Sequence, residues 1–317
     1  MIIWYNHISY DKSMDRFFWE WENDFLKEEN IRELPPLSIW WLITWRCNLY
    51  CIHCYWNLED LPKEEIDSYD AMKLCDNIIQ SWIQRVSISW WEPMVRKDVF
   101  EIIEYLADNG ISVIMSSNWL FVKDNIDKLK KLRHIEFSLD WWKRETHNNI
   151  RPTRNHVNNS FDIALEAIEC AVKNGIKTRV LTTLNRYNVN ELDQIWNILQ
   201  NYWVDERHIW NTTNAWRAHA IYETLMEWVH SDDSIKDKLQ DKFKKVKIQF
   251  NYPSKANNYY ALILPDGCMY TQDYKTWKKI KLWSLIENPI NKFWNDTNFD
   301  IRWHYIKRLN IDTKKLM

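Results

Sequence analysis

The chain has 317 residues and a formal net charge of −2, with 42 basic and 44 acidic residues, so no surface for a polyanion such as nucleic acid is expected. It can bury one large core, or a large domain beside a small one. No apolar run approaches the roughly 18–20 residues that cross a bilayer, and the start lacks a signal-peptide pattern. We therefore expect a cytoplasmic protein without membrane partners. In that compartment its six cysteines are expected to be ligands or core thiols.

Residues 1–36 form a polar and aromatic lead-in to which no chemistry can be assigned. From residue 37 short runs rich in Ile, Val, Leu and Thr alternate with helical patterns. The predicted strands are Leu37–Thr44, Arg85–Ser89, Ser112–Ser116, His134–Leu139, Thr178–Thr183 and His208–Asn211. The predicted helices lie near 69–81, 97–109, 123–132, 160–174 and 189–201. This order implies βαβ units around a parallel sheet, an α/β fold whose strand count favours an incomplete (β/α)6 barrel.

The alternation is expected to stop after about residue 215. There a charged helical stretch, "SDDSIKDKLQDKFKKV", precedes several strand-like segments, and the Asp-Gly pair in "LPDGCMYTQ" predicts a hairpin. We therefore divide the chain into a lead-in (1–36), a partial-barrel domain (37–214) and a small α+β C-terminal appendage (215–317).

The composition has one abnormal feature, because the chain contains 22 Trp and 3 Gly, whereas glycine ordinarily makes up about 7% of residues. Helices that lead into strands often end on a left-handed residue, usually glycine. Four such junctions carry Gly110, Gly175, Trp82 and Trp203 in equivalent places. Either the protein is unusually rich in tryptophan, or many of these positions are glycine in the native chain. A codon that the source reads as glycine, rendered here as tryptophan, would produce this pattern.

Three cysteines in "CNLYCIHC", Cys47, Cys51 and Cys54, directly follow the first predicted barrel strand, where α/β sheets and barrels place their sites. A structural zinc ion needs four ligands, and His53 lies between two of the cysteines and is expected to point away from them. A redox Cys-x-x-Cys pair does not need Cys47. Three thiolates on a four-iron cluster leave one iron open to an exogenous ligand. Three thiols without a metal are the remaining alternative.

The segment "CNLYCIHC" resembles the CxxxCxxC cluster loop of radical S-adenosylmethionine (radical SAM) enzymes, with His53 in the place of an aromatic residue before the last cysteine, and the resemblance implies that His53 helps to bind the cofactor. The resemblance covers roughly residues 37–214. It implies that Cys47, Cys51 and Cys54 hold one [4Fe–4S] cluster, and that the amino and carboxylate groups of SAM chelate the open iron.

A second segment, "SISWWEP", resembles the family's Gly-Gly-Glu-Pro motif, whose backbone meets the amino end of the methionine moiety of SAM. The resemblance therefore implies SAM contacts at Trp90, Trp91, Glu92 and Pro93. Trp90 and Trp91 depart from the motif at its two glycines, and a close backbone approach to a ligand is what glycine permits and an indole obstructs.

Two further segments extend the resemblance. In "SSNWLF", which is similar to the family's "TNG", Asn118 is retained as an expected contact of SAM, and Trp119 replaces glycine. In "FSLDWWKRETHNNIRP", similar to "SLDG…TH…R", the resemblance implies that Ser138 and Arg151 contact the ribose and carboxylate of SAM. Asp140 is expected to shape the turn rather than to touch the ligand.

The resemblance implies that the protein reductively cleaves SAM to a 5′-deoxyadenosyl radical, which abstracts hydrogen from a substrate, with an electron donor such as flavodoxin or ferredoxin. No catalytic side chain is identified, and the chemistry would be of oxidoreductase or lyase type. The appendage resembles the SPASM and twitch branches but offers only Cys268, so no auxiliary cluster is expected. Cys75 and Cys170 fit core positions in helices. A peptide substrate is favoured; small-molecule cofactor biosynthesis and a non-catalytic cluster-binding scaffold are the alternatives.

The glycine hypothesis extends beyond the helix ends. Eight tryptophans lie where a turn, a helix end or an approaching ligand calls for glycine: Trp45, Trp56, Trp82, Trp90, Trp91, Trp119, Trp141 and Trp203. Trp294, by contrast, suits the apolar face of an ordinary helix.

Overall fold

The structure is a computed structural model that describes residues 2–5, 8–11, 16–19, 37–54, 64–81, 83–89, 91–154, 159–212, 218, 220–227, 229, 233–243, 247–251, 261–272 and 279–290. Its strands are β1 (Ile2–Tyr5), β2 (Ile8–Asp11), β3 (Arg16–Trp19), β4 (Ser38–Trp41), β5 (Arg85–Ile88), β6 (Ser112–Ser117), β7 (His134–Ser138), β8 (Thr178–Leu184), β9 (Glu206–Asn211), β10 (Lys247–Asn251), β11 (Leu262–Ile263), β12 (Cys268–Gln272) and β13 (Lys279–Ser284). Its helices are α2 (Ser68–Gln80), η1 (Pro93–Val95), α3 (Val99–Asp108), η2 (Lys123–Leu129), α4 (Arg144–Ile150), α5 (Ser160–Lys173), α6 (Leu192–Gln200), α8 (Tyr222–Met226) and α9 (Asp233–Lys242).

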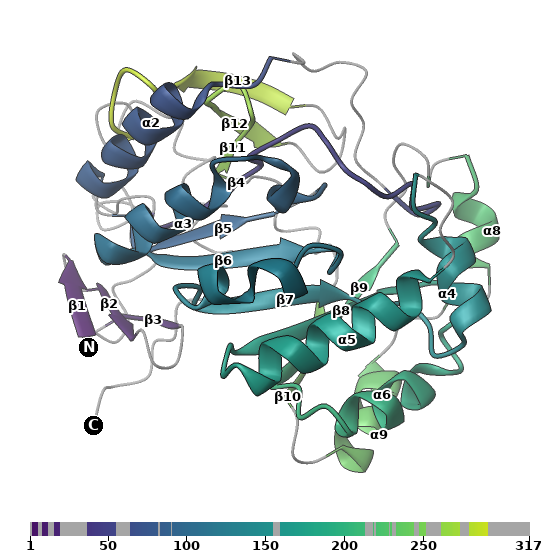
Figure 1. The fold of residues 1–317 in the computed structure, drawn as a ribbon. Coiled ribbons are helices and arrows are strands. Elements are labelled where there is room, and N and C mark those ends of the chain that lie inside the picture. Colours follow the sequence, from purple (N-terminus) through teal and green to yellow (C-terminus); the bar gives the residue numbers. More distant parts are fainter. Residues whose placement is uncertain are drawn as a thin grey trace.

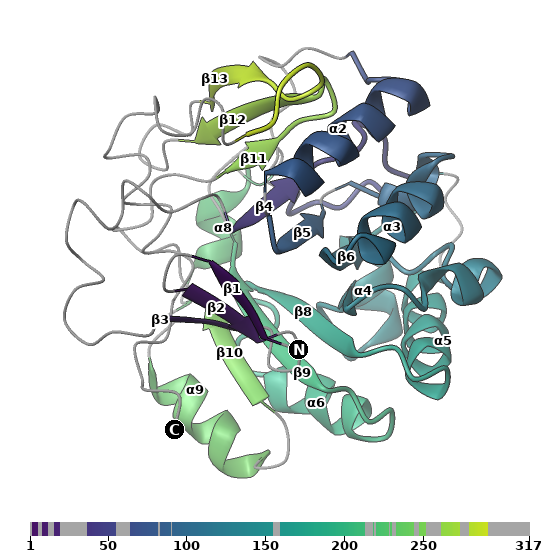
Figure 2. The same ribbon diagram turned by 90° about the vertical axis from the view of Figure 1, so that its left-hand side faces the viewer.

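The main sheet has ten strands in the order β10-β9-β8-β7-β6-β5-β4-β11-β12-β13. From β4 to β10 each strand pairs in parallel with the next one in the chain. Figure 2 shows these strands in an arc, with α2, α3, α5 and α6 along its outer side. The expected incomplete α/β barrel is confirmed. A separate antiparallel sheet, β1-β2-β3, lies near the end at which the parallel strands begin (Figures 1 and 2).

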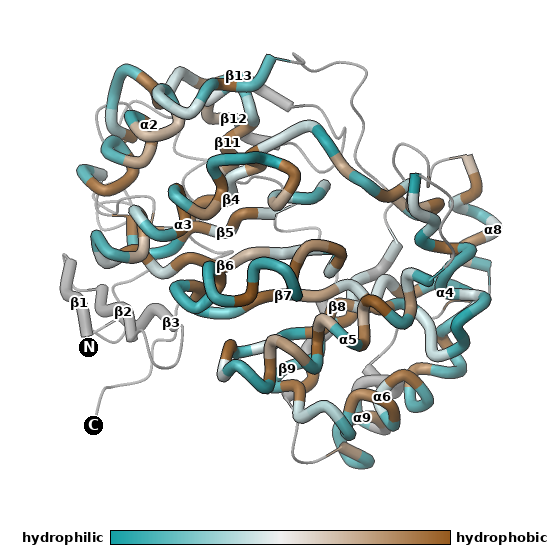
Figure 3. Tube along the Cα trace, viewed as in Figure 1, coloured by the Kyte–Doolittle hydropathy of each residue, from teal (hydrophilic) through white to brown (hydrophobic). Residues whose placement is uncertain are grey.

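The sequence periodicities explain why these segments form a barrel wall. In α3 the buried residues Val99, Ile102, Ile103 and Leu106 recur at helical spacing and face the sheet. In β8 buried and partly exposed residues alternate strictly, as expected of a strand with one face against helices and the other toward the barrel interior. Figure 3 shows hydrophobic and hydrophilic residues succeeding one another along α5 and α6. The core therefore lies between the strands and the outer helices.

The α/β alternation continues beyond residue 215, and the expectation that it stops there is wrong. α9 is followed by β10, which pairs in parallel with β9 from Lys247 opposite Glu206 to Asn251 opposite Trp210. The sequence indicated the charged helix and the strand-like segments after it, but not that the first of these strands pairs with β9. The segment near 123–132 also differs, since it forms the 3-10 helix η2 rather than an α-helix.

The predicted hairpin around Asp-Gly is confirmed, because β11 and β12 pair antiparallel on either side of it. β11 also pairs in parallel with β4, opposite Trp40 and Trp41, and so continues the sheet past the first barrel strand. Gly267 closes the turn with a φ of +72°, and a Cβ there would lie 2.8 Å from the side chain of Ile286. The division of the chain at 214/215 stays a prediction.

Within the described residues, a positive φ occurs at Gly110, Gly175, Gly267, Trp91, Trp119 and Trp203. The prediction that position 203 is left-handed like positions 110 and 175 is thus confirmed. Trp45 and Trp141 do not have a positive φ, so at these two positions the backbone itself does not call for glycine. Four of the other tryptophans discussed above, Trp56, Trp82, Trp90 and Trp294, lie outside the described residues. None of the helices described is long and apolar enough to cross a membrane.

Candidate functional site

The loop that follows β4 carries the three clustered cysteines and is held by an antiparallel partner from a distant part of the chain. Leu49 forms an isolated β-bridge with Thr153. Three backbone hydrogen bonds extend this pairing: Tyr50 N to Pro152 O (2.8 Å), Ile52 N to Ile150 O (3.0 Å) and Arg154 N to Asn48 O (3.0 Å). The loop from Cys47 to Cys54 therefore lies along residues 150–154, which begin at the last residue of α4 (Figure 1).

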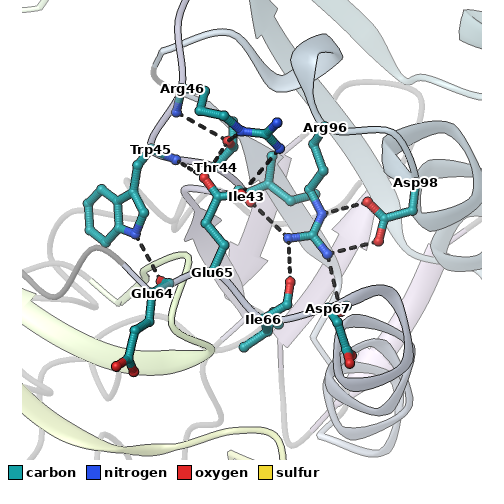
Figure 4. A network of polar contacts seen from close by, with 10 residues as sticks. All are labelled: Ile43, Thr44, Trp45, Arg46, Glu64, Glu65, Ile66, Asp67, Arg96 and Asp98. Carbon is teal, nitrogen blue, oxygen red and sulfur yellow. Dashed lines mark hydrogen bonds and ion pairs between the residues drawn. The ribbon is translucent and has the colours of Figure 1, made fainter.

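The base of this cysteine loop is clamped by Glu65, which precedes α2 (Figure 4). Glu65 Oε1 accepts hydrogen bonds from the Thr44 hydroxyl and from the backbone N–H of Trp45, both at 2.7 Å. Its second oxygen, Oε2, accepts from Arg46 Nη2 at 3.3 Å. One carboxylate thus fixes the three residues that immediately precede Cys47.

A buried guanidinium reinforces the same region from the other side. Arg96 donates from Nη1 to the carbonyls of Ile43 (3.2 Å) and Ile66 (3.0 Å), and from Nη2 to the carbonyl of Asp67 (3.3 Å). Asp98 holds the guanidinium through two hydrogen bonds of 2.7 and 2.8 Å. Arg96 consequently joins the end of β4 to the start of α2 (Figure 4).

The three clustered thiols are partly exposed and none forms a disulfide. Cys47 Sγ accepts from the backbone N–H of Leu49 at 3.4 Å and from Asn118 Nδ2 at 3.7 Å. Burial, with the nearby Cys51, raises the pKa of the Cys47 thiol to about 12. A thiolate at Cys47 is therefore expected only when a metal compensates its charge.

Asn118, at the end of β6, connects that strand to the cysteine loop. Its Nδ2 also donates to Asn48 Oδ1 at 2.5 Å, and its backbone N–H donates to Glu92 Oε2 at 2.7 Å. Glu92 is fully buried, and its carboxylate also accepts from the Ser117 hydroxyl at 3.2 Å and from Met94 N at 3.1 Å. Burial raises the pKa of Glu92 to about 7 in spite of these donors. Glu92 thus ties the end of β5 to the end of β6.

Arg151 lies beside the second thiol. Its Nη1 donates to Cys51 Sγ at 3.5 Å, and its Nε donates to Asp140 Oδ2 at 2.5 Å. Asp140 is completely buried, and its other oxygen accepts from the backbone N–H of Thr183 at 2.8 Å. Burial opposes ionisation of Asp140, but Arg151 and His53 outweigh it and lower the pKa of that carboxyl to about 2. The Asp140 carboxylate therefore orients the guanidinium toward the cysteine loop.

His53 is buried, and its Nε2 lies 3.3 Å from Asp140 Oδ2. Burial lowers the pKa of this imidazole to about 4, so the ring is neutral near pH 7. His53 therefore faces Asp140. This agrees with the expectation that its side chain points away from the cysteines and is not a fourth metal ligand beside them.

Cys54 and Trp91 pack against one apolar group formed by Leu42, Leu262, Leu264, Cys268 and Tyr270. The rings of Trp45 and Trp91 meet edge to face, with centroids 5.2 Å apart. The residues of the second motif, 91–93, therefore lie next to the cysteine loop, and Glu92 N donates to Arg46 O at 3.2 Å. Trp90 lies outside the described residues.

The predicted site residues lie at the end of β7 or in the segments that follow β4, β5, β6 and β7, and Arg151 is the residue directly after α4. Asn118 and Arg151 donate hydrogen bonds to two thiols of the cysteine loop, those of Cys47 and Cys51. His53 belongs to the loop and lies beside Asp140. The backbone N–H of Glu92 donates to the carbonyl of Arg46, which directly precedes the loop. Pro93 begins η1 and is buried, while Ser138 ends β7 and its carbonyl accepts from Trp119 Nε1 at 3.0 Å. Assignment of these residues to SAM contacts stays a prediction.

Sequence reasoning missed three of the residues that shape this site, namely Asn48, Glu65 and Arg96. Asn48 stood within the cysteine motif, so its position was a usable signal. Glu65 and Arg96 lie in segments without periodicity, and no feature of the sequence indicates that they converge on the base of the loop.

The donor set fits an iron–sulfur cluster. Among the residues that the structure describes, no three His, Cys, Asp or Glu side chains are grouped around the position of one metal ion. A four-iron cluster does not require such grouping, because each thiolate binds a different iron. Donors to Sγ at Cys47 and Cys51 are of the kind that stabilise and tune such clusters.

The model of the radical SAM superfamily matches residues 41–199, which is just over half of the chain. The chain belongs to the radical SAM superfamily. Members of this superfamily are enzymes, and their cofactors are a [4Fe–4S] cluster and SAM, so the expectations of an enzyme with these cofactors are confirmed.

Two curated radical SAM relatives indicate the range of similarity. The Fe-coproporphyrin III synthase of Methanosarcina barkeri is 30% identical over 173 residues, which cover 53% of this chain and 42% of that protein. The mycofactocin maturase MftC of Mycolicibacterium smegmatis is 26% identical over 163 residues, which cover 50% of this chain and 40% of that protein. The chain spans about half the length of the curated relatives it matches.

A solved structure matches over more of the chain. Streptococcus suis SuiB bound to S-adenosylmethionine superposes with a TM-score of 0.64 at 14% identity, and the match covers 84% of this chain and 67% of SuiB. At this identity the similarity establishes the partial-barrel fold alone.

Proposed function

We propose that this radical SAM enzyme holds its cluster on Cys47, Cys51 and Cys54 and modifies a peptide substrate. The observation that carries the site assignment is the position of the three thiols: they lie on one loop at the end of β4, with Arg151 donating to Cys51 and Asn118 donating to Cys47. When bound, the cluster and SAM supply the radical chemistry, and the protein supplies positioning and exclusion of water.

The residues of this chain have separate tasks in the proposal. Glu65 and Arg96 fix the loop from its base, and residues 150–154 fix it along its length. Asp140 holds the Arg151 guanidinium against the loop, where its free donors can meet a carboxylate such as that of SAM. Glu92 fixes the loop after β5, so that the backbone at 91–93 faces the cysteine loop.

The proposal that the substrate is a peptide rests on two relatives of this chain. MftC is named a maturase, and SuiB has been crystallised with its precursor peptide SuiA. The test is anaerobic reconstitution of the chain with iron and sulfide, followed by incubation with SAM, reductant and a short peptide encoded beside the gene. We expect release of 5′-deoxyadenosine and a mass change in the peptide. A peptide of unchanged mass, with 5′-deoxyadenosine still formed, would exclude that peptide class as substrate.

A second candidate is cofactor biosynthesis, which is favoured by the 30% identity to the Fe-coproporphyrin III synthase. Incubation of the reconstituted enzyme with a porphyrin or another small-molecule cofactor precursor distinguishes the two. A new chromophore from the precursor, with no modified peptide, would favour this candidate over peptide maturation.

A further inference from the structure

We propose that positions 91, 119 and 203 are glycine in the native protein. In the described part of the chain these three are the non-glycine residues with a positive φ, at 48°, 74° and 55°. A Cβ is penalised in this left-handed region, and glycine adopts it freely. Asn and Asp are the residues that otherwise tolerate it best, so a set composed entirely of tryptophan is not explained by ordinary preference.

Position 203 gives the clearest comparison, because two glycines of the same chain occupy equivalent places. Gly110 after α3 and Gly175 after α5 have φ values of 89° and 72°, and each donates its N–H to the carbonyl three residues earlier, at 3.0 Å. Trp203 after α6 makes the same bond to Gln200 O at 3.5 Å. The residue is 81% exposed, so the indole gains little burial in return for the strained backbone.

Position 119 shows the same mismatch between a tryptophan side chain and a left-handed backbone, here in the interior of the protein. Trp119 directly follows Asn118 at the end of β6, and its indole is fully buried near His147, with ring centroids 6.2 Å apart. The Ser117 hydroxyl already accepts the backbone N–H of residue 119 at 3.0 Å, which holds the turn in its left-handed form without any side chain at 119.

Position 91 links the inference to function, and this step rests on the proposed function. The Trp91 indole packs beside the cysteine loop, against Trp45 and the apolar group that also contacts Cys54. Glycine at 91 would leave the neighbouring backbone open to a ligand bound at the loop. Two observations therefore favour glycine at position 91: its left-handed backbone conformation and its place beside the cysteine loop.

The inference does not extend to every tryptophan of the chain. Trp41 in β4 and Trp196 in α6 are fully buried and lack a positive φ, so the backbone gives no reason to reassign them. One cause accounts for the three left-handed positions together: the source organism reads as glycine a codon that appears as tryptophan in the printed sequence. Positions 91, 119 and 203 are then expected to share one codon that differs from the standard tryptophan codon.

The deciding experiment is peptide mass spectrometry of the protein purified from its source organism. Glycine at 91, 119 and 203 is expected, and tryptophan at any of the three would overturn the proposal. This result does not depend on the reaction, so it separates a failure of this inference from a failure of the proposed function.

A second experiment tests the backbone argument on the chain as printed. Trp203→Gly should raise the Tm by about 2–4 °C, whereas Trp203→Ala, which also removes the indole but keeps Cβ, should not. In the reconstituted protein, Trp91→Gly should bind SAM at least ten times more tightly than the parent, with Trp203→Gly as the control that leaves affinity unchanged. Equal Tm values for the two variants at 203 would contradict the conformational argument.

Discussion

Arg151 and Cys51 lie 100 positions apart in the sequence, yet the Arg151 guanidinium donates to the Cys51 thiol at 3.5 Å. The contact exists because the cysteine loop and residues 150–154 pair through their backbones. Arg151 is also bound to the buried Asp140. A single side chain therefore connects the cysteine loop to the segment that follows the fourth barrel strand.

We predict that Arg151→Ala weakens both the cluster and the fold. Removing one partner of a buried ion pair costs about 3–5 kcal/mol, because Asp140 would be left as an uncompensated charge. The cluster of the reconstituted variant should release iron to a chelator faster than that of the parent, and its Tm should fall. Arg144→Ala, which breaks an exposed ion pair with Asp162, is the matched control. Iron release at the parental rate would mean that the contact to Cys51 has no part in holding the cluster.

The cysteine assignment is tested by individual replacement. Changing Cys47, Cys51 or Cys54 to Ala should abolish the visible absorbance and the stoichiometric iron of the reconstituted protein, since each thiolate is expected to bind its own iron. Cys75→Ala and Cys170→Ala should retain both signals, because these thiols lie in α2 and α5, away from the loop. Full iron content in Cys51→Ala would be incompatible with the assignment.

The sequence was sufficient to predict the barrel because its strands and helices carry different hydrophobic periods. β8, for example, was predicted as Thr178–Thr183 and runs from Thr178 to Leu184. The place of β10 in the barrel sheet escaped prediction because most residues of the preceding α9 are charged and its sequence has no broad apolar face that would indicate packing on that sheet. Local pattern identifies an element, but here only the pairing with β9 shows to which sheet it belongs.

For the site, spacing identified the cysteines, and the family resemblance identified Asn118 and Arg151. The pairing of Tyr50 with Pro152 could not be foreseen, because it joins two segments that are not strands and depends on the folded barrel. The same applies to Arg96, whose three carbonyl partners come from two separate segments. The conformation of Trp203 was predictable, because the end of a helix is a local feature with a known preference for glycine.

The hydrogen bonds that Glu65 accepts at the base of the loop predict that replacing Glu65 weakens the cluster, and that the loss depends on whether the new side chain still offers an acceptor. Glu65→Ala should remove the acceptor of Thr44 and Trp45, and hydrogen bonds to a charged group contribute about 1.5–3 kcal/mol. Its cluster should therefore assemble less completely and release iron faster. Glu65→Gln keeps an oxygen for these two donors and should restore most of the cluster content.

The neighbouring carboxylate provides the control. The structure uses the backbone carbonyl of Glu64, which accepts from Trp45 Nε1, so Glu64→Ala should leave the cluster unaffected. If Glu65→Ala and Glu64→Ala gave the same iron content and release rate, the clamp would not act on the cluster.

The last prediction concerns acid stability and arises from the ion network across β7, β8 and β9. Arg179 pairs with Glu136 and, at 2.8 Å, with Glu206, and the Ser116 hydroxyl donates to Glu136 at 2.6 Å. Burial opposes ionisation of Glu136, but Arg179, His134 and Ser116 outweigh it and hold the pKa of its carboxyl well below its usual range.

A carboxyl whose folded pKa is depressed binds fewer protons in the folded than in the unfolded state, so its contribution to stability is present above the unfolded pKa of 4.5 and declines as the pH falls below it. Glu136→Gln should therefore be less stable than the parent near pH 7, and the difference should shrink as the pH is lowered through this range. Urea unfolding midpoints at a series of pH values measure it. Glu166→Gln, in an exposed pair with Lys123, is expected to follow the parent throughout. A Glu136→Gln deficit that stays constant with pH would show that the ionisation of this carboxyl does not support the fold.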